Sequence, residues 1–204
     1  MGLSKLLAEE SEDFSKDEIQ NLSMSLYKSA SSTYNLLEDL LEWSQIQRGL
    51  TKPVLKKVGV KKLIDDVVFV HQEMMIKKSL ELQVHINDDL FADLDIKMIQ
   101  TVIRNLLTNA IKFTPVGGKV WIEAKKETEK IELVIADSGI GIPSSLLPKL
   151  FDVDGSKGRK GTEGERSSGL GLLICKEFIE LNGGKIWVES IENKGSQFFI
   201  EIPC

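Results

Sequence analysis

DIKMIQTVIRNLLTNAIKF, residues 95–113, is the segment around which the rest of this chain is arranged. At about 100° per residue, its apolar side chains cover one wide face of a helix, and Asn105, Asn109 and Lys112 fall within one narrow arc. Asparagine is a mediocre helix former because its side chain bonds to nearby backbone. Two carboxamides and one ammonium on one line suit a hydrated divalent cation and the phosphates that it carries. On this segment alone, a solvated helix face with chance asparagines is an equal alternative.

The chain has 204 residues, enough for one domain with a real core plus an appendage. Its formal net charge of −5 argues against a protein that binds nucleic acid or a membrane surface. No apolar run approaches the roughly 18 residues that cross a bilayer, and no signal peptide opens the chain, so we expect no membrane segment in it. Cys175 and Cys204 form neither a disulfide framework nor a metal-ligand spacing, which favours a cytoplasmic location.

Residues 1–50 predict a helical hairpin. Residues 2–9 are typical of the end of an amphipathic helix, and a second helix runs from the capping-box pair Ser15 and Glu18 to about Arg48. The apolar positions of this second helix are spaced by threes and fours: Ile19, Leu22, Leu26, Ala30, Thr33, Leu36, Leu37, Leu40, Trp43 and Ile46. Such a seam is typical of a coiled coil or bundle. Because two helices cannot bury it well alone, we expect the hairpin to associate with a second copy of the chain.

From residue 51 onward, strands and helices follow one another in mixed order. The expected strands are 54–58, 80–86, 90–93, 119–126, 130–136, 185–190 and 196–202, and the expected helices are 60–78, 95–113, 143–151 and 169–181. Helix 60–78 should turn inward Leu63, Ile64, Val67, Val68, Met74 and Met75. Residues 152–168 are Gly-rich, charged and without period, which predicts a mobile loop. The order predicts an α+β fold, a two-layer α/β sandwich rather than a doubly wound parallel sheet, with 130–136 apolar enough to be its central strand.

Two glycine-rich stretches lie beside this framework. Asp137-Ser-Gly139-Ile-Gly141-Ile-Pro143 leaves the end of the central strand, where glycines let a backbone approach a ligand and a carboxylate can accept from an exocyclic amine. Ser168-Gly169-Leu170-Gly171-Leu172 opens a helix, whose unpaired N–H groups form a ready anion site. A lone D-x-G-x-G is most often an ordinary turn, and the second stretch is neither a dinucleotide fingerprint nor a Walker loop.

Taken together, N-x-x-x-N-A-x-K at residues 105–112, the D-x-G-x-G about 30 residues on, and G-L-G-L before a helix resemble the ATP-binding domain of sensor histidine kinases. This is a branch of the GHKL superfamily, shared with type II topoisomerases, mismatch-repair ATPases and a heat-shock chaperone. The resemblance implies the Bergerat ATP-binding fold, a mixed sheet with about three helices, over residues 51–204. Because LLEWSQIQRG is similar to the end of the kinases' dimerisation hairpin, residues 1–50 are expected to be part of that hairpin.

Roles can be carried over position by position from this family, with ATP and Mg²⁺ as the implied cofactors. Asn109 would ligate Mg²⁺, Asn105 would support the metal and phosphates, and Lys112 would contact phosphate. Asp137 would bind the adenine amine, and Phe113, where the kinases often have tyrosine, would pack near the base.

The glycine-rich stretches have implied roles as well. The remaining expected cofactor-binding residues are Gly139, Gly141, Phe151, Arg166, Ser168, Gly169, Leu170, Gly171 and Leu172. Gly139 and Gly141 would let the base sit against the backbone, and residues 169–172 would supply amides to the phosphates. Phe151 matches the phenylalanine before the family's nucleotide lid, residues 152–168 match that lid, and Arg166 would close onto the phosphates.

One position separates the kinases from the ATPases of this superfamily. The ATPases carry a glutamate four residues before the metal-binding asparagine, as the base that activates water. Here that position is Asn105, which cannot take a proton, so the sequence favours transfer of the γ-phosphoryl group to a histidine and relay to a response-regulator receiver domain. An ATPase and a catalytically silent nucleotide-binding module remain as alternatives.

The family's phosphoacceptor is a histidine followed by an acidic residue. By alignment it should lie about ten residues before Gly2, so we expect this chain to be a fragment that lacks it. His71 lies on the apolar stripe of helix 60–78 and should be buried, and His85 should be exposed on the polar side of a strand.

Overall fold

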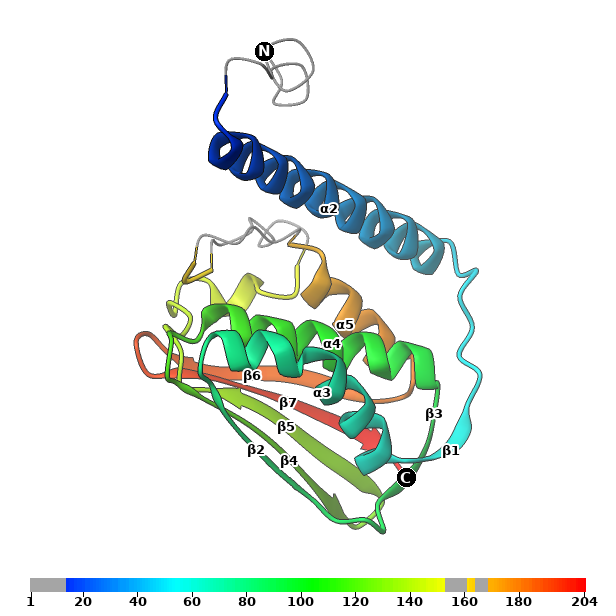
Figure 1. Cartoon of the computed structure of the whole chain (residues 1–204). Coiled ribbons are helices and arrows are strands. Elements are labelled where there is room, and N and C mark those ends of the chain that lie inside the picture. Colours follow the sequence, from blue (N-terminus) through cyan, green and yellow to red (C-terminus); the bar gives the residue numbers. More distant parts are fainter. Residues whose placement is uncertain (1–13, 153–160, 164–168) are drawn as a thin grey trace.

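A five-stranded mixed sheet forms one layer of the molecule (Figure 1). In this computed structural model, which describes residues 14–152, 161–163 and 169–204, the strand order is β2–β4–β5–β7–β6. The strands are β2 (Glu81–Ile86), β4 (Lys119–Glu127), β5 (Lys130–Asp137), β6 (Lys185–Ile191) and β7 (Gly195–Pro203). β2 pairs in parallel with β4, and the other neighbours are antiparallel. The strand predicted to be central, β5, lies in the middle of the sheet.

Three helices form the second layer: α3 (Val60–Lys77), α4 (Ile96–Phe113) and α5 (Gly171–Leu181). They cover one face of the sheet, with α4 between and in contact with the other two (Figure 1). On α4, Val102, Ile103, Leu106 and Leu107 are fully buried, and each such side chain contributes roughly 1.5–3 kcal/mol. The α+β two-layer sandwich is therefore confirmed, and α4 is the helix that the sequence places at its centre.

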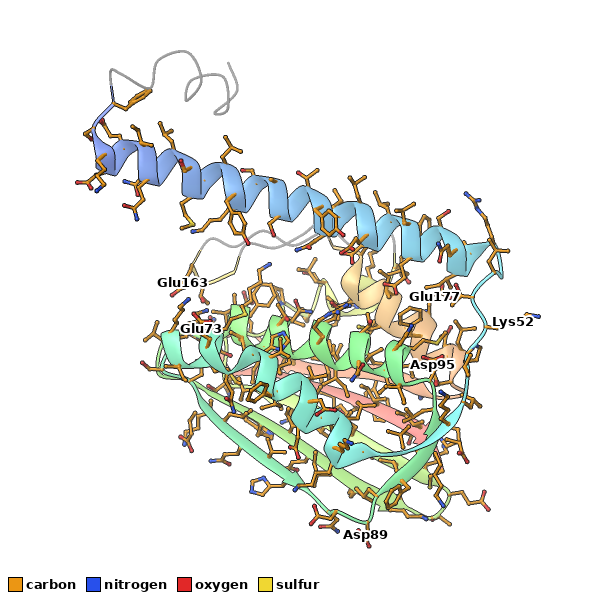
Figure 2. The ribbon with its side chains drawn as sticks, turned by 45° about the vertical axis from the view of Figure 1, so that its right-hand side comes forward. Lys52, Glu73, Asp89, Asp95, Glu163 and Glu177 are labelled. Carbon is orange, nitrogen blue, oxygen red and sulfur yellow. The ribbon has the colours of Figure 1, made fainter. Side chains whose placement is uncertain are left out.

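The Asn-bearing helix is fixed at its N-terminus by Asp95, which Figure 2 labels at that end. One Asp95 carboxylate oxygen accepts from the backbone N–H groups of Lys97 and Met98, and the other accepts from that of Val54 at 2.8 Å. The two short strands nearby, β1 (Lys56–Gly59) and β3 (Phe91–Leu94), pair with each other in a separate two-stranded ladder. The strands expected at 54–58 and 90–93 are confirmed, shifted by one or two residues.

Two predictions about local structure are wrong. The helix expected at 143–151 is only a 3-10 turn, η2 (Leu147–Lys149), because Pro148 lacks the N–H that an α-helix would need there. Met74, expected to face inward, is 46% exposed. The buried stripe of α3 passes through His71 and Met75 instead, which leaves Met74 at its edge.

The first described helix, α2 (Lys16–Gln47), begins and ends as predicted. Ser15 Oγ accepts from Glu18 N, Glu18 Oε2 accepts from Ser15 N, and Gly49 after the helix has φ of +65°. Among the described residues, its seam is best covered at the C-terminal end, where Trp43 packs on the core and Ile46 is buried. Ile19, Leu22 and Leu26 are partly buried, whereas Leu36, Leu37 and Leu40 are exposed. Near the C-terminal end, Gln47 Nε2 donates to Glu177 of α5 at 3.1 Å (Figure 2).

Parts of the N-terminal and loop predictions lie outside the described residues. These are the helix end at 2–9 and most of the loop 152–168, so the hairpin and its pairing with a second copy stay predictions. Within the described part of the chain, the length and apolar character needed to cross a bilayer are not combined in any helix.

Candidate functional site

The C-terminal end of α4 gathers four segments of the chain. The last four carbonyl groups of an α-helix have no partner within the helix, so a buried helix end must find donors elsewhere. The donors here are Thr114 N and Oγ1 to Ala110 O, Lys78 Nζ to Ile111 O, Thr162 N to Lys112 O, and Ile140 N to Phe113 O, at 2.6–3.1 Å. The end of α4 therefore fixes the segment that follows Asp137, as well as the end of α3 and residue 162.

The three polar residues of α4 differ in their surroundings. Asn105 Nδ2 donates to the carbonyl oxygen of Gly171, at the start of α5, at 3.4 Å. Lys112 is 7% exposed, with its Nζ 5.3 Å from the centre of the Phe113 ring. Within the described part of the chain, no hydrogen bond involves the half-exposed Asn109 carboxamide. Among the described residues, Asn109 is thus the member of the arc whose carboxamide makes no hydrogen bond in the free protein.

Asp137 is a buried carboxylate at the end of the central strand. It is 5% exposed, and its Oδ1 accepts from Gly139 N at 2.8 Å, while the backbone N–H of Ser196 donates to the same carboxyl. Burial raises the pKa of Asp137 to about 6, and the two backbone donors oppose this shift. Near neutral pH the group is mostly ionised, so it can accept a hydrogen bond from a ligand amine.

A hollow of about 460 Å³ lies beside Asp137. Its walls come from β4, η2 and the β6–β7 hairpin: Trp121, Leu147, Val188, Glu189, Ser190, Ile191, Lys194, Gly195, Ser196 and Gln197. Ser196 is the cross-strand partner of Asp137, and sequence reasoning missed it. The sequence feature that could have indicated Ser196 is the Gly195-Ser196 pair, which follows the turn at Asn193. A glycine at 195 lets the start of β7 pack closely against the backbone of Asp137.

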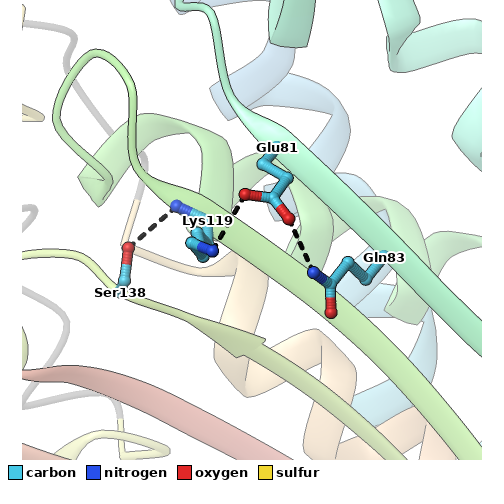
Figure 3. Close-up of polar contacts among 4 residues, drawn as sticks. All are labelled: Glu81, Gln83, Lys119 and Ser138. Atoms are coloured by element: carbon cyan, nitrogen blue, oxygen red, sulfur yellow. Dashed lines mark hydrogen bonds and ion pairs between the residues drawn. The ribbon is translucent and has the colours of Figure 1, made fainter.

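Ser138, directly after Asp137, is held to the first residue of β4 (Figure 3). Its Oγ accepts from Lys119 N at 2.8 Å, and Lys119 Nζ lies 2.9 Å from Glu81 Oε2 on the neighbouring strand. Gln83 Nε2 completes the row by donating to Glu81 Oε1. The loop after Asp137 is therefore fastened both to the sheet and to α4.

Gly139 and Gly141 have packing reasons of their own. A Cβ on Gly139 would lie 2.4 Å from Phe113 O, and one on Gly141 would lie 2.1 Å from Ile191 O. Gly141 also has φ of +63°, a region that other residues rarely adopt. These glycines allow α4 and the β6–β7 hairpin to approach the loop after Asp137, and the expected contact with a base stays a prediction.

We expect Gly139→Ala to lower the free energy of unfolding by about 2 kcal/mol, because its methyl group would meet fixed backbone. Gly171→Ala is the matched control, since its Cβ would make only ordinary contacts, 3.5 Å from the Asn105 carboxamide. Alanine in a helix should leave stability equal or slightly higher. Denaturant unfolding measures both, and equal stability of the two variants would contradict this account of Gly139.

The start of α5 faces Asn105. Gly169 has φ of +81°, and α5 begins at Gly171 after Leu170. Among the described residues no side chain caps this helix start, and its first turn holds no acidic residue. The start of a helix favours an anion, and the expected contact of these N–H groups with phosphate stays a prediction. Leu170 is buried, and Leu172 and Phe151 pack against the hydrophobic core. Arg166 and Ser168, also expected in the site, lie outside the described residues.

Comparison with known proteins indicates the family and the fold of this chain. The model of the family described as histidine kinase-, DNA gyrase B- and HSP90-like ATPase matches residues 94–204. The alginate biosynthesis sensor protein KinB of Pseudomonas aeruginosa is 33% identical over 172 residues, which cover 82% of this chain and 28% of KinB. The chain spans less than half of the length of each of the curated relatives compared with it.

Solved structures give the same result for the fold. The catalytic domain of histidine kinase ThkA is 33% identical, with a TM-score of 0.65, and the match covers 74% of this chain and 95% of that domain. ThkA in complex with the response regulator protein TrrA matches 98% of this chain and 56% of that chain with a TM-score of 0.75. At 24% identity, this second likeness concerns the fold alone.

Proposed function

This chain belongs to the histidine kinase-, DNA gyrase B- and HSP90-like ATPases, among the catalytic domains of sensor histidine kinases, and we propose that it binds Mg-ATP and donates the γ-phosphoryl group to a histidine. ATP is the nucleotide of this family, and the adenine end would lie at Asp137. The phosphates would lie between the polar arc of α4 and the start of α5. The phosphohistidine would then pass its phosphoryl group to an aspartate of a response regulator.

The observation that carries this proposal is the buried Asp137 carboxylate beside a hollow at the end of β5. An ionised acceptor in a largely buried place selects a ligand with an amine at that point, and the exocyclic amine of adenine provides one. In GTP the same position is a carbonyl, so an acceptor would face an acceptor. Asp137 therefore supports adenine selectivity.

The side chains available at this site fit Mg²⁺ rather than a metal that protein ligands alone surround. The described residues contain no cluster of three or more His, Cys, Asp or Glu side chains that could hold a metal. Mg²⁺ usually keeps several waters and takes one or two protein oxygens together with phosphate oxygens. The Asn109 carboxamide can supply one such oxygen, Lys112 an ammonium for phosphate, and α5 its first N–H groups. The bound metal would neutralise charge on the phosphates during transfer.

Asn105 favours a kinase over a hydrolase. It occupies the position of the ATPases' general base, but a carboxamide cannot take a proton from water, and its Nδ2 donates to Gly171 O. Water near the γ-phosphate is thus left unactivated, which protects the phosphoryl group for transfer to a side chain. A hydrolase of the same family remains the second candidate. The products of the assay described below distinguish it from a kinase.

Partners follow from the same proposal. ThkA has been solved with a response regulator, and by its fold this chain is suited to a similar partner. The exposed leucines of α2 support pairing with a second copy of the chain, because an apolar seam of this length gains roughly 25 cal/mol per Å² when covered. We further propose a cytoplasmic location, supported by the two unpaired cysteines and by the need for ATP.

Incubation with labelled ATP and Mg²⁺ tests the proposal. We expect label to pass to a separately supplied hairpin that carries an acceptor histidine, and no acid-labile phosphate to appear on this chain. His71 is 7% exposed, with Nδ1 2.8 Å from Val67 O and Nε2 3.3 Å from Thr108 Oγ1. His85 is exposed, with Nδ1 4.0 Å from Glu123 on the neighbouring strand. Both placements confirm the sequence prediction.

Three results of this assay would count against the proposal. Label recovered as phosphohistidine at residue 71 or 85 would overturn the argument about the acceptor. Rapid release of inorganic phosphate without transfer would favour the hydrolase, and absence of ATP binding would favour the silent module. A reaction without Mg²⁺ serves as the control.

A further inference from the structure

Lys78 is a buried lysine directly after α3. It belongs to none of the motifs to which the proposed function assigns a role. It is 4% exposed, and its Nζ donates to Ile111 O at 2.9 Å, Lys112 O at 3.3 Å and Thr162 Oγ1 at 2.7 Å. Its own carbonyl oxygen accepts from Gly117 N at 3.0 Å, in the turn between α4 and β4. One residue therefore joins the end of α3, the end of α4, the following turn and residue 162.

The physical chemistry of this placement is specific. An ammonium group has three donors, and among the described residues three oxygens accept from this one. Burial of a charge is costly unless its donors are satisfied, so the ammonium requires these oxygens where they lie. Two of them are carbonyls of the last turn of α4, where the helix dipole favours a cation. Lys78 thus stabilises one arrangement of the α4 end over others.

Thr162 is held from both sides. Its Oγ1 accepts from Lys78 Nζ and lies 3.0 Å from Lys112 O, to which its only hydroxyl proton can be donated. Its backbone N–H donates to the same Lys112 oxygen at 3.1 Å. Residue 163, next to it, lies at the same end of the helix layer as Glu73 of α3 (Figure 2). Thr162 is thereby hydrogen-bonded to the carbonyl of Lys112, the residue whose ammonium is expected to contact phosphate.

We propose that Lys78 is a positioning residue of the nucleotide site, which fixes the last turn of α4 and Thr162 so that Lys112 presents its ammonium to the phosphates. This inference rests on the proposed ATP binding. Lys78 acts through Lys112 and Thr162 and does not itself contact the nucleotide. Its loss should therefore weaken recognition of the phosphates and leave recognition of adenine at Asp137 unchanged.

Lys78→Met removes the ammonium and keeps most of the side-chain volume. We expect about tenfold weaker binding of Mg-ATP with unchanged binding of adenosine, both measured by titration calorimetry or chemical-shift titration. Lys77→Met is the matched control, because Lys77 is the preceding residue, is exposed, and forms a surface ion pair with Glu73. A merely structural role for Lys78 would lower the melting temperature without changing the ratio of ATP to adenosine affinity.

Thr162→Val provides a second test that leaves the buried ammonium in place. We expect the same selective loss of ATP affinity, together with faster hydrogen exchange at the residue 162 amide, which the native structure protects through Lys112 O. If Lys78→Met does not fold, Thr162→Val decides the question. An unchanged affinity ratio and unchanged exchange in Thr162→Val would overturn the proposal.

Hydrogen exchange at residue 162 also separates this inference from the proposed function, because it is measured without nucleotide. If the unaltered chain binds no ATP, the proposed function fails. Faster exchange in Lys78→Met and Thr162→Val, but not in Lys77→Met, would still support the anchor at the end of α4. Equal exchange in all variants would overturn the anchor whatever the result with ATP.

Discussion

Replacement of Asn109 by alanine is expected to weaken Mg-ATP binding by about a hundredfold while leaving the unfolding of the free protein almost unchanged. Within the described part of the chain, its carboxamide makes no hydrogen bond and is only half-buried, so its loss leaves no partner unsatisfied. Alanine is also the better helix former, by a few tenths of a kcal/mol. The loss of a metal ligand therefore appears in binding, typically as a factor of about 10–100. Calorimetric titration and thermal unfolding measure the two effects separately.

Magnesium itself provides the sharpest control for Asn109. If the carboxamide acts through the metal, the difference between wild type and Asn109→Ala should disappear when EDTA removes Mg²⁺. Lys97→Ala, an exposed change just over three turns earlier on α4, should affect neither condition. A difference that persists without Mg²⁺ would show that Asn109 contacts the nucleotide directly. Equal affinity with Mg²⁺ would remove Asn109 from the site, and loss of folding would mean that its role is structural.

The sequence predicts most of this fold because its signals are local and periodic. Helix α4 has both a continuous apolar face and a capping residue at Asp95, and β5 is apolar from Leu133 to Ala136. Such patterns are decided within one element. The two wrong predictions, Met74 and the segment 143–151, lie where local signals compete. Met74 is adjacent to a buried methionine. In 143–151, Pro143 is suited to begin a helix, but Pro148 five residues later cannot continue an α-helix.

The candidate site is less accessible to sequence reasoning for a different reason. Its predicted residues come from motifs, whereas the contacts that position them join main-chain groups far apart in sequence. The carbonyl of Phe113 accepts from Ile140, and that of Lys112 accepts from Thr162. No side-chain pattern reports such bonds, because any residue type carries the same N–H and C=O groups. Sequence reasoning also fails to identify Lys78, because a lysine at a helix end is usually a solvated cation.

The glycines show that one pattern can have two causes. D-x-G-x-G was expected to permit approach of a base, yet the backbone of α4 and of the β6–β7 hairpin occupies the space beside Gly139 and Gly141. The requirement for glycine therefore already exists in the free protein. A change at either position that abolishes ATP binding would by itself say little about contact with adenine, which makes Asp137 the better probe of that end of the site.

Replacement of Asp137 by asparagine is expected to stabilise the free protein and to abolish most of its ATP affinity. Because the pKa of Asp137 in the folded protein is about 6, against 3.8 as the ordinary value, the folded state binds this proton more tightly than the unfolded state. Stability contributed by the protonated group is therefore present at low pH and is lost as pH rises from about 4 to about 6. Above pH 6 the buried charge costs about 3 kcal/mol, which the neutral amide should largely recover.

Affinity for ATP should change in the opposite direction. The carboxylate accepts from the adenine amine, whereas the amide nitrogen of asparagine and the proton of the acid form are donors, so affinity should fall about tenfold or more in Asp137→Asn at pH 8. In the wild type, affinity should decline as pH falls through about 6, while stability rises. The pH dependence of the phosphates is common to both proteins, so the difference between wild type and variant isolates Asp137. Denaturant unfolding and ATP titration between pH 5 and 8 measure both curves, and an asparagine variant that is less stable yet binds ATP normally would refute this role for Asp137.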